Sequence, residues 1–397
     1  MKYNFDELID RTHTGSLKVE ALNTIWGRTD LLPLWVADMD FRTPPFIIKA
    51  LKERMEHEIF GYTTPDEGYY TSISEWVKKQ YGMSAGRESI HYIPGIVPGI
   101  HFAINALTEK GDKIMIQPPV YHPFKQVINA TGRKLVTNPL KLVDNHFEMD
   151  FEAMEQNIKG CKVFILCNPH NPGGVVWSKE TLEKVAEICE KNQTLVFSDE
   201  IHADMTLPPH HHIPFAMINE QAKMNSITFM SPSKAFNMPG IIASHVIVFH
   251  PSVRRRLFFY LMENDLDAGN VFAFNAVKAA YTQGEEWLKQ MLQYVQENID
   301  YVTGYLEKKM PKIKVMQPEA SFLLFLNCNE LRFSTQKELE DFFVDKAHLA
   351  LNSGTLFGEE GKGFMRLNVA SPKKRIEQAM FQLEEAYQKL EAAQGDR

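Results

Sequence analysis

Lys234 follows Ser231 and Ser233 and precedes a Pro-Gly pair in the stretch SPSKAFNMPG, residues 231–240. A lysine amine is a nucleophile that can hold an aldehyde as a Schiff base, and serine hydroxyls can donate hydrogen bonds to an anion such as phosphate. Most lysines are instead solvated at the surface. The chemistry of Lys234 therefore depends on the groups that the fold brings to it.

Five short apolar runs predict the strands that position this segment. The runs KIMI, KVFILC, TLVF, SITFM and HVIVF begin at Lys113, Lys162, Thr194, Ser226 and His245. Runs that lack regular polar alternation are typical of strands buried on both faces, as in a parallel sheet.

The segment SKETLEKVAEICEKN lies between the second and third predicted strands and predicts a helix. Ser178 is a favourable N-cap residue at its start. The apolar residues at helical spacing are Leu182, Val185, Ala186 and Cys189. A strand, a helix and a strand in this order form a βαβ unit, so we predict an α/β fold with a mainly parallel sheet.

Polar side chains follow three successive predicted strands. These residues are Asn168, Asn171, Asp199, His202, Ser231, Ser233 and Lys234. Each one alone has a structural explanation, because Asn-Pro pairs form turns and strand-end carboxylates cap helices. In a parallel sheet, however, ligands bind beyond the carboxyl ends of the strands. An amine, a carboxylate and hydroxyl donors at one edge are the groups that a pyridoxal 5'-phosphate site requires.

The composition narrows the class of protein. The chain has 397 residues, of which 44% are hydrophobic, so it can bury a large core in two domains. Its net charge of −7, without a basic stripe, argues against nucleic-acid binding. No segment approaches the ~20 apolar residues of a membrane helix, and the N-terminus MKYNFDELID lacks the apolar part of a signal peptide. We therefore expect a cytoplasmic protein without membrane contact.

Cysteine and histidine patterns do not indicate a metal site. The four cysteines contain no Cys-x-x-Cys pair and fit reduced thiols. The adjacent histidines 210–212 lack the spacing of metal ligands on one helix face, so we expect no metal.

Seven motifs in order resemble those of the MalY/PatB-type cystathionine β-lyases (C–S lyases), within the fold-type I pyridoxal phosphate enzymes of the aspartate aminotransferase superfamily. The motifs are PLWVADMDF, IFGYTTP, QPPVYHPF, CNPHNPGG, SDEIHADM, SPSKAFNMPG and GFMRLN. The resemblance implies a large cofactor-binding domain over residues 46–289, with a mainly parallel sheet. It also implies a smaller α+β domain formed by residues 1–45 and 290–397.

The resemblance implies roles for four residues around the cofactor ring. Lys234 would hold the cofactor as a Schiff base and move the proton at the substrate Cα. Asp199 would keep the pyridine nitrogen protonated, Asn171 would donate to the phenolic oxygen, and Tyr121 would stack on the ring. By its local sequence alone, Tyr121 is interpreted as an aromatic residue of the core, and the surrounding motifs favour stacking on the ring.

The phosphate of the cofactor needs its own donors. The stretch YIPGIVPGIHFAINAL predicts a Pro/Gly turn followed by a helix, so the N–H groups of Ile96 and Val97 would face an anion. Ser231 and Ser233 would add their hydroxyls. Tyr62 resembles the tyrosine that, in this superfamily, reaches the phosphate from the other subunit, which implies a homodimer.

Substrate binding is expected from both ends of the chain. A guanidinium can hold a planar α-carboxylate with two parallel hydrogen bonds, and Arg366 in GFMRLN fits this role. The alternative for Arg366 is an exposed position on a strand face. Backbone groups near Ala37 would close over the same site, and Asn171 would also contact the amino-acid substrate.

Two positions depart from the pattern of many aminotransferases. Ile242 stands eight residues after Lys234, where those enzymes carry an arginine that pairs with the phosphate. His202 stands where they commonly place a tyrosine beside the cofactor. The β-lyases that this chain resembles share the histidine, so the change points away from transamination, although the chemical role of His202 stays open.

The resemblance implies α,β-elimination of S-linked cysteine derivatives, including L-cystathionine, to pyruvate, ammonia and a thiol. Two alternatives remain at this point: an aminotransferase with the same residues, and a cofactor-bearing regulatory protein that acts through a surface patch. The sequence does not fix which thioether or thiol is the natural substrate.

Overall fold

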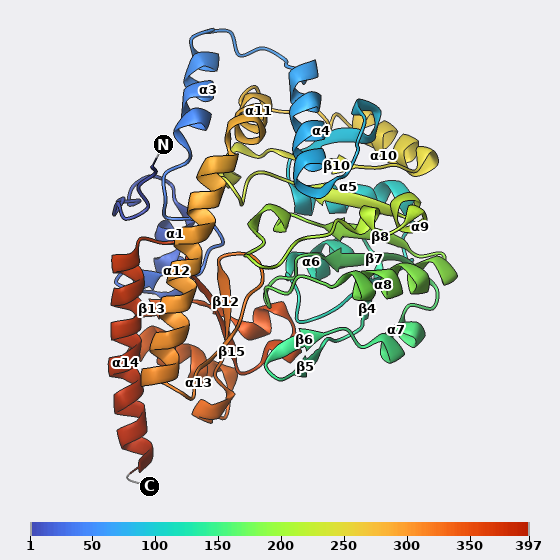
Figure 1. Cartoon of the computed structure of the whole chain (residues 1–397). Helices are drawn as coiled ribbons and strands as arrows, with labels where there is room; N and C mark the ends of the chain where they lie inside the picture. Colours follow the sequence, from blue (N-terminus) through green and yellow to red (C-terminus); the bar gives the residue numbers. More distant parts are fainter. Residues whose placement is uncertain (1, 396–397) are drawn as a thin grey trace.

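A computed structural model describes residues 2–395 of the chain. Its largest element is a seven-stranded sheet (Figure 1). In spatial order its strands are β2 (Ile90–Ile93), β10 (Ser244–Ile247), β9 (Ser226–Met230), β8 (Leu195–Asp199), β7 (Cys161–Cys167), β3 (Lys113–Ile116) and β4 (Lys134–Thr137). The α/β fold with a mainly parallel sheet is thereby confirmed.

Strand β10 is antiparallel to both of its neighbours, β9 and β2. The reason lies in its connection to β9, which contains only the short 3₁₀ helix Pro239–Ile241. A parallel neighbour needs a crossover connection, usually through a helix, whereas this connection returns the chain directly.

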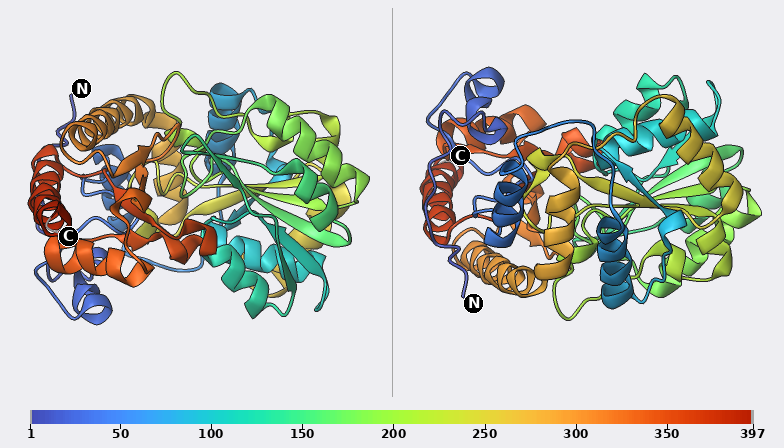
Figure 2. Two further views of the ribbon diagram at one scale, coloured as in Figure 1. Left: turned by 90° about the horizontal axis from the view of Figure 1, so that it is seen from below. Right: turned by 90° about the horizontal axis from the view of Figure 1, so that it is seen from above.

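Helices cover both faces of the sheet (Figure 2). Side chains of β7 alternate between two apolar clusters: Phe164 and Leu166 pack on one side, and Val163 and Ile165 pack on the other. Burial on both sides explains why the strands read as uninterrupted apolar runs. The helices of this part are α3 (Pro45–Met55), α4 (Glu67–Tyr81), α5 (Ile96–Leu107), α6 (Pro123–Ala130), α7 (Phe151–Asn157), α8 (Lys179–Lys191), α9 (Glu220–Met224), α10 (Pro251–Glu263) and α11 (Ala273–Gln283).

Helix α8 forms where the sequence predicts it. The side chain of Ser178 accepts a hydrogen bond from the N–H of Thr181 at the start of the helix. Four apolar residues at helical spacing are buried against the sheet: Leu182, Val185, Ala186 and Cys189.

A second sheet is formed by the C-terminal part of the chain. Its four antiparallel strands, in spatial order, are β11 (Lys314–Met316), β12 (Leu323–Asn327), β15 (Phe364–Asn368) and β14 (Asn352–Ser353). The long helices α12 (Glu285–Lys309) and α14 (Lys373–Gly395) lie side by side (Figure 1), and their buried apolar residues share one cluster with Leu324, Leu326, Met365 and Leu367 on one face of this sheet. The N-terminal strand β1 (Leu32–Pro33) pairs in parallel with β13 (Leu349–Ala350), which brings the two ends of the chain together.

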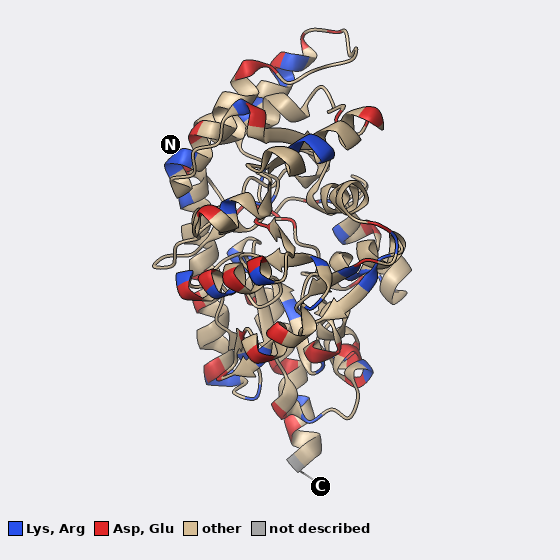
Figure 3. Cartoon of the chain, turned by 90° about the vertical axis from the view of Figure 1, so that its right-hand side faces the viewer, with Lys and Arg blue, Asp and Glu red and all other residues tan. Residues whose placement is uncertain are grey.

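The remaining elements are short. The α-helices and strands among them are α1 (Leu17–Glu20), α2 (Leu22–Trp26), α13 (Gln336–Asp341) and the hairpin of β5 (Lys141–Val143) with β6 (His146–Glu148). Among the described residues, no helix is both long and apolar enough to span a membrane. Basic and acidic residues are interspersed on the face shown in Figure 3.

Candidate active site

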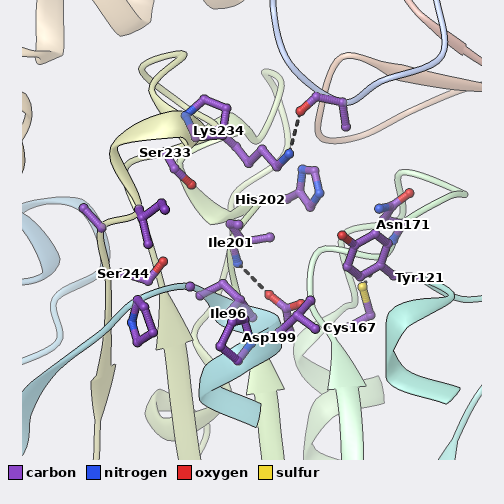
Figure 4. Close-up of a pocket in the computed structure, with 18 residues that line it drawn as sticks. Ile96, Tyr121, Cys167, Asn171, Asp199, Ile201, His202, Ser233, Lys234 and Ser244 are labelled. Carbon is purple, nitrogen blue, oxygen red and sulfur yellow. Dashed lines mark hydrogen bonds between the residues drawn. The ribbon is translucent and has the colours of Figure 1, made fainter. Parts of the chain in front are cut away.

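A cavity of about 210 Å³ opens at the carboxyl ends of β7, β8 and β9 (Figure 4). Most of the predicted site residues line it. These are Ala37, Ile96, Val97, Tyr121, Asn171, Asp199, His202, Ser233 and Lys234. The structure therefore brings together residues from six separate segments of the chain, and three of these segments are the strand ends that the sequence groups at one edge of the sheet.

Lys234 lies in the loop after β9 with its amine directed into the cavity (Figure 4). Its Nζ donates a hydrogen bond to the carbonyl oxygen of Ala37 at 2.5 Å. Burial lowers the pKa of Lys234 to about 8, and the nearby cation of Arg366 contributes to this shift. An amine with this pKa is partly unprotonated near neutral pH, which a nucleophile or base requires.

Asp199 ends strand β8 and is buried on the opposite side of the cavity from Lys234 (Figure 4). Its Oδ1 accepts the backbone N–H of Ile201 at 3.1 Å. Burial raises the pKa of Asp199 to about 7, and the N–H of Ile201 acts in the opposite direction. A buried carboxylate with so little compensation would be stabilised by a cationic partner.

The N-terminus of α5 supplies donors for an anion. Gly95 precedes the helix, which begins at Ile96, and Gly95, Ile96 and Val97 all line the cavity. The first N–H groups of a helix have no partner within the helix, and Pro98 has no N–H at all. The backbone donors of Ile96 and Val97 are therefore available at this end of the cavity, and Ser233 also lines the cavity.

Three predicted residues do not line this cavity. Ser231 is buried, and its hydroxyl is hydrogen-bonded to the carbonyl oxygen of Ala243 and to the hydroxyl of Ser233. Ser231 therefore holds the Ser233 side chain in place without lining the cavity itself. Arg366 is not part of the cavity lining, but its guanidinium donates a hydrogen bond to Asn171, which lines the cavity. Tyr62 is fully exposed on the segment between α3 and α4.

Arg366 is buried on β15, so the alternative of an exposed strand-face arginine is wrong. Its guanidinium donates to Asn171 Oδ1 at 3.1 Å, to Asn352 Oδ1 at 2.7 Å and to the carbonyl of Trp35 at 3.2 Å. The guanidinium carbon lies 4.8 Å from the ring centre of Phe357, and Nε has no hydrogen-bond partner among the described residues. Burial lowers the pKa of Arg366 to about 10, so it remains a cation at neutral pH.

The two departures from the aminotransferase pattern both lie at the cavity. Burial, together with the cations of Lys234 and Arg366, lowers the pKa of His202 to about 3. His202 is therefore a neutral imidazole, and its buried Nδ1 has no partner in the described part of the chain. Ile242 has a φ of 58°, a left-handed conformation that is strained for a β-branched residue.

Some residues at the cavity are not among the site residues that the sequence analysis predicts. They include Cys167, Ile201 and Ser244 on the lining, and Asn352 as a partner of Arg366. Ser244 is the first residue of β10, which runs antiparallel to β9, so the start of this strand lies at the cavity. In a parallel strand the first residue would lie at the opposite edge of the sheet, which is why the sequence does not predict Ser244. Asn352 has no local signal, because its contact with Arg366 arises only when β14 pairs with β15.

The residues present fit pyridoxal 5'-phosphate. Lys234 offers a buried amine, Asp199 a buried carboxylate that favours a cationic partner, and the N-terminus of α5 a place for a phosphate. His202, whose buried Nδ1 has no partner among the described residues, also lines this cavity.

The family model of aminotransferase class I and II matches residues 29–383. The chain belongs to this family. Among curated members, cystathionine beta-lyase PatB of Bacillus subtilis (strain 168) is 41% identical over 367 residues, covering 92% of this chain and 95% of that protein. Protein MalY of Escherichia coli (strain K12) is 29% identical, covering 95% of this chain and 97% of that protein.

A solved structure of this family has the same fold. Cystalysin from Treponema denticola, whose crystal structure contains pyridoxal 5'-phosphate, superposes with a TM-score of 0.93 at 32% identity, covering 98% of this chain and all of that chain. Similarity over the full length confirms the predicted fold-type I architecture and the resemblance to the MalY/PatB group.

Proposed function

We propose that this member of the class I and II aminotransferase family is a pyridoxal phosphate-dependent carbon–sulfur β-lyase. Its substrates are S-linked cysteine derivatives such as L-cystathionine, and its products are pyruvate, ammonia and a thiol. The observation that carries the proposal is the meeting of Lys234, Asp199 and the N-terminus of α5 in one cavity. The similarity to cystathionine beta-lyase PatB supports the choice of reaction.

Five residues would hold the cofactor. Lys234 would bind its aldehyde carbon, Asp199 its pyridine nitrogen and Asn171 its phenolic oxygen, while Tyr121 would cover the ring face. Ser233 would bind the phosphate, together with the N–H groups at the start of α5. When bound, the cofactor supplies an acceptor for the electrons released at the substrate Cα.

The chain's own residues would perform the proton transfer and the positioning. Arg366 orients the α-carboxylate, and its burial makes the charge-assisted bonds stronger than they would be in water. Lys234 removes the Cα proton, which its lowered pKa permits near neutral pH. The Cβ–S bond then breaks and the thiolate leaves with the electron pair. One water is consumed in releasing pyruvate and ammonia.

We further propose that the enzyme is a homodimer in which Tyr62 binds the phosphate in the partner subunit. The support is the position of Tyr62, which is fully exposed and outside the cavity of its own chain. Ile59 and Phe60 expose apolar side chains on the same segment, as does Met55 at the end of α3, and such a patch is typical of an interface.

We also propose the division into a large domain, residues 46–289, and a small domain, residues 1–45 and 290–397. The pairing of β1 with β13 and the separate four-stranded sheet within residues 314–368 support it. We place the protein in the cytoplasm on the basis of its sequence.

The test of the proposed function is turnover of L-cystathionine without any keto acid. A lyase releases pyruvate and ammonia in equal amounts over many turnovers. Lys234→Ala should lower this rate by several orders of magnitude while the fold is retained. An unchanged rate in the Lys234→Ala variant would refute the proposed role of this lysine.

An aminotransferase is the second candidate, because the matching family carries that name. It would stop after one turnover without a keto acid, and with 2-oxoglutarate it would form glutamate steadily. Glutamate formation without pyruvate release would establish transamination instead.

A further inference from the structure

Five charged side chains, of which Lys18 and Asp40 are buried and the other three are partly exposed, form a group next to the cavity, here called the ion cluster: Arg11, Lys18, Asp38, Asp40 and Arg375. Lys18 is fully buried, with its Nζ 2.9 Å from Asp40 and 3.6 Å from Asp38. Arg11 lies 2.6 Å from Asp38 and 2.9 Å from Asp40, and Arg375 lies 3.3 Å from Asp40. Neither Lys18 nor Asp40 lines the cavity.

Net stability is a weak explanation for such a cluster. Removing charges from water costs several kcal/mol per ion, and well-packed apolar residues of similar volume are often at least as stabilising. Directional bonds between buried charges instead favour one arrangement of the segments that carry them. The relevant question is therefore which segment the ion cluster fixes.

The segment is residues 35–41, here called the strap, which contains both Asp38 and Asp40. Two strap carbonyls accept hydrogen bonds from residues with proposed roles in the reaction. The carbonyl of Trp35 accepts from Arg366 at 3.2 Å, and that of Ala37 accepts from Lys234 at 2.5 Å.

Two asparagines hold the same strap from its two flanks. The side-chain amide of Asn368, on β15, donates to the carbonyls of Val36 at 2.6 Å and Asp38 at 2.7 Å. Asn237, in the loop after Lys234, accepts the N–H of Met39 and donates to its carbonyl, both at 3.0 Å. The strap is thus tied to both sheets, and the ion cluster also contacts it through Asp38 and Asp40.

We propose that the ion cluster is a positioning device: it fixes the strap so that the carbonyls of Trp35 and Ala37 hold the guanidinium of Arg366 and the amine of Lys234 in place. Lys18 and Asp40 are then positioning residues, since neither touches the cavity. The inference rests on the proposed function only for the roles of Lys234 and Arg366.

The strap also influences the protonation of Lys234. The charged and titratable groups that face this amine are Arg366, Asp38, Asp199 and His202. The Asp38 carboxylate favours the ammonium form, and so does the Ala37 carbonyl that accepts its hydrogen bond. A loosened strap moves the carbonyl away, and the pKa of Lys234 then falls further.

The test is the double variant Lys18→Met/Asp40→Asn, made in the full-length holoenzyme. It removes one cation and one anion, so the net charge is unchanged. A change in exchange or KM therefore reflects the position of the strap more than a change in net charge. Amide hydrogen exchange in the strap should rise by at least ~10-fold, while exchange in α12 stays as in the wild type. KM for L-cystathionine should rise ~10-fold, with a smaller effect on kcat.

Arg133→Met provides a matched control. Arg133 is also a buried cation, and it bonds Thr108 at 3.0 Å and Asn105 at 2.9 Å, away from the strap. Its replacement should lower the melting temperature and leave strap exchange and KM unchanged.

If the double variant is less stable than the wild type but has the same hydrogen exchange in the strap and the same KM, the inference is overturned. The ion cluster would then contribute to stability only. Where the double variant fails to fold, Arg375→Met gives the same test, since Arg375 is partly exposed and lies at the edge of the cluster. Strap exchange should rise ~3-fold in that variant, and no rise overturns the inference. Absence of lyase activity in the wild type would refute the proposed function, but the exchange test would stand.

Discussion

Lys234 and Asp199 have pKa values that burial shifts in opposite directions, because burial disfavours the charged form of each. The pKa of Lys234 falls to about 8 and that of Asp199 rises to about 7. The two groups therefore titrate near the working pH of a cell, although their ordinary values of 10.5 and 3.8 lie far apart.

The pKa of Lys234 predicts its reactivity in the apoprotein. Only the unprotonated amine is a nucleophile, so labelling of Lys234 by an amine-reactive reagent should rise through a midpoint near pH 8. Mass spectrometry of the labelled peptide measures this directly. Arg366→Met removes a cation that lowers the pKa, so it should move the midpoint upward. A wild-type midpoint near pH 10 would contradict the prediction.

Asp199→Asn should separate stability from cofactor binding. The pKa of Asp199 is raised on folding, so its protonated form stabilises the fold below about pH 4, and this stability is lost as the pH rises through about 7. At pH 8 the apoprotein of the variant should be more stable than the wild type, by on the order of 2 kcal/mol. Urea unfolding of wild type and variant at pH 5 and pH 8 measures the stability difference and its dependence on pH.

The same Asp199→Asn variant should retain pyridoxal phosphate less well, because a neutral amide cannot pair with a protonated pyridine nitrogen. Dialysis followed by cofactor absorbance measures the retention. A variant that gains no stability, or that holds the cofactor as the wild type does, would argue against the proposed role of Asp199.

At the scale of elements, the site depends on where strands end and helices begin. Strand β8 ends at Asp199, and α5 begins at Ile96, so both elements place their ends at the cavity. Helix α8 contributes no residue to the cavity lining and serves to cover the sheet through its buried stripe. Its N-cap can therefore be altered without changing the site.

Ser178→Ala should lower the free energy of unfolding by about 1 kcal/mol, because the N–H of Thr181 loses its acceptor. The kcat and KM should remain those of the wild type. Urea unfolding and steady-state kinetics test the two parts, and Ser178→Asp serves as the control that keeps an acceptor. A loss of activity without a loss of stability would show that α8 influences the site in a way its contacts do not suggest.

At the scale of the whole molecule, the exposed position of Tyr62 makes dimer formation testable. If Tyr62 binds the phosphate of the partner subunit as proposed, Tyr62→Phe would remove one hydrogen bond to a charged group and should weaken cofactor affinity by at least ~10-fold. Co-expression of Tyr62→Phe with Lys234→Ala chains should restore one intact site in each mixed dimer. Cofactor titration and lyase activity of the purified mixed dimer measure this recovery.

The control for this experiment is a Tyr62→Phe chain paired with a Tyr62→Phe/Lys234→Ala chain, which contains no intact Tyr62. Recovery in both mixtures, or in neither, would argue against donation of Tyr62 across the interface.

The sequence alone determines the local parts of this protein. Uninterrupted apolar runs identify the strands, because burial on both faces removes the alternation of polar residues. The N-cap serine and the apolar residues at helical spacing identify helix α8, because both features depend only on residues within the same segment. Strand-end residues such as Asn171, Asp199 and Lys234 can be grouped from the sequence, since parallel strands end at one edge of a sheet.

Only the tertiary structure decides what depends on contacts between distant segments. The reversed direction of β10, the bond of Arg366 to Asn352 and the burial of Lys18 leave no local pattern in the sequence. The pKa values of Lys234 and Asp199 likewise depend on how deeply the assembled fold buries them. Desolvation and long-range pairing are properties of the packed chain, so residue types and their spacing cannot specify them.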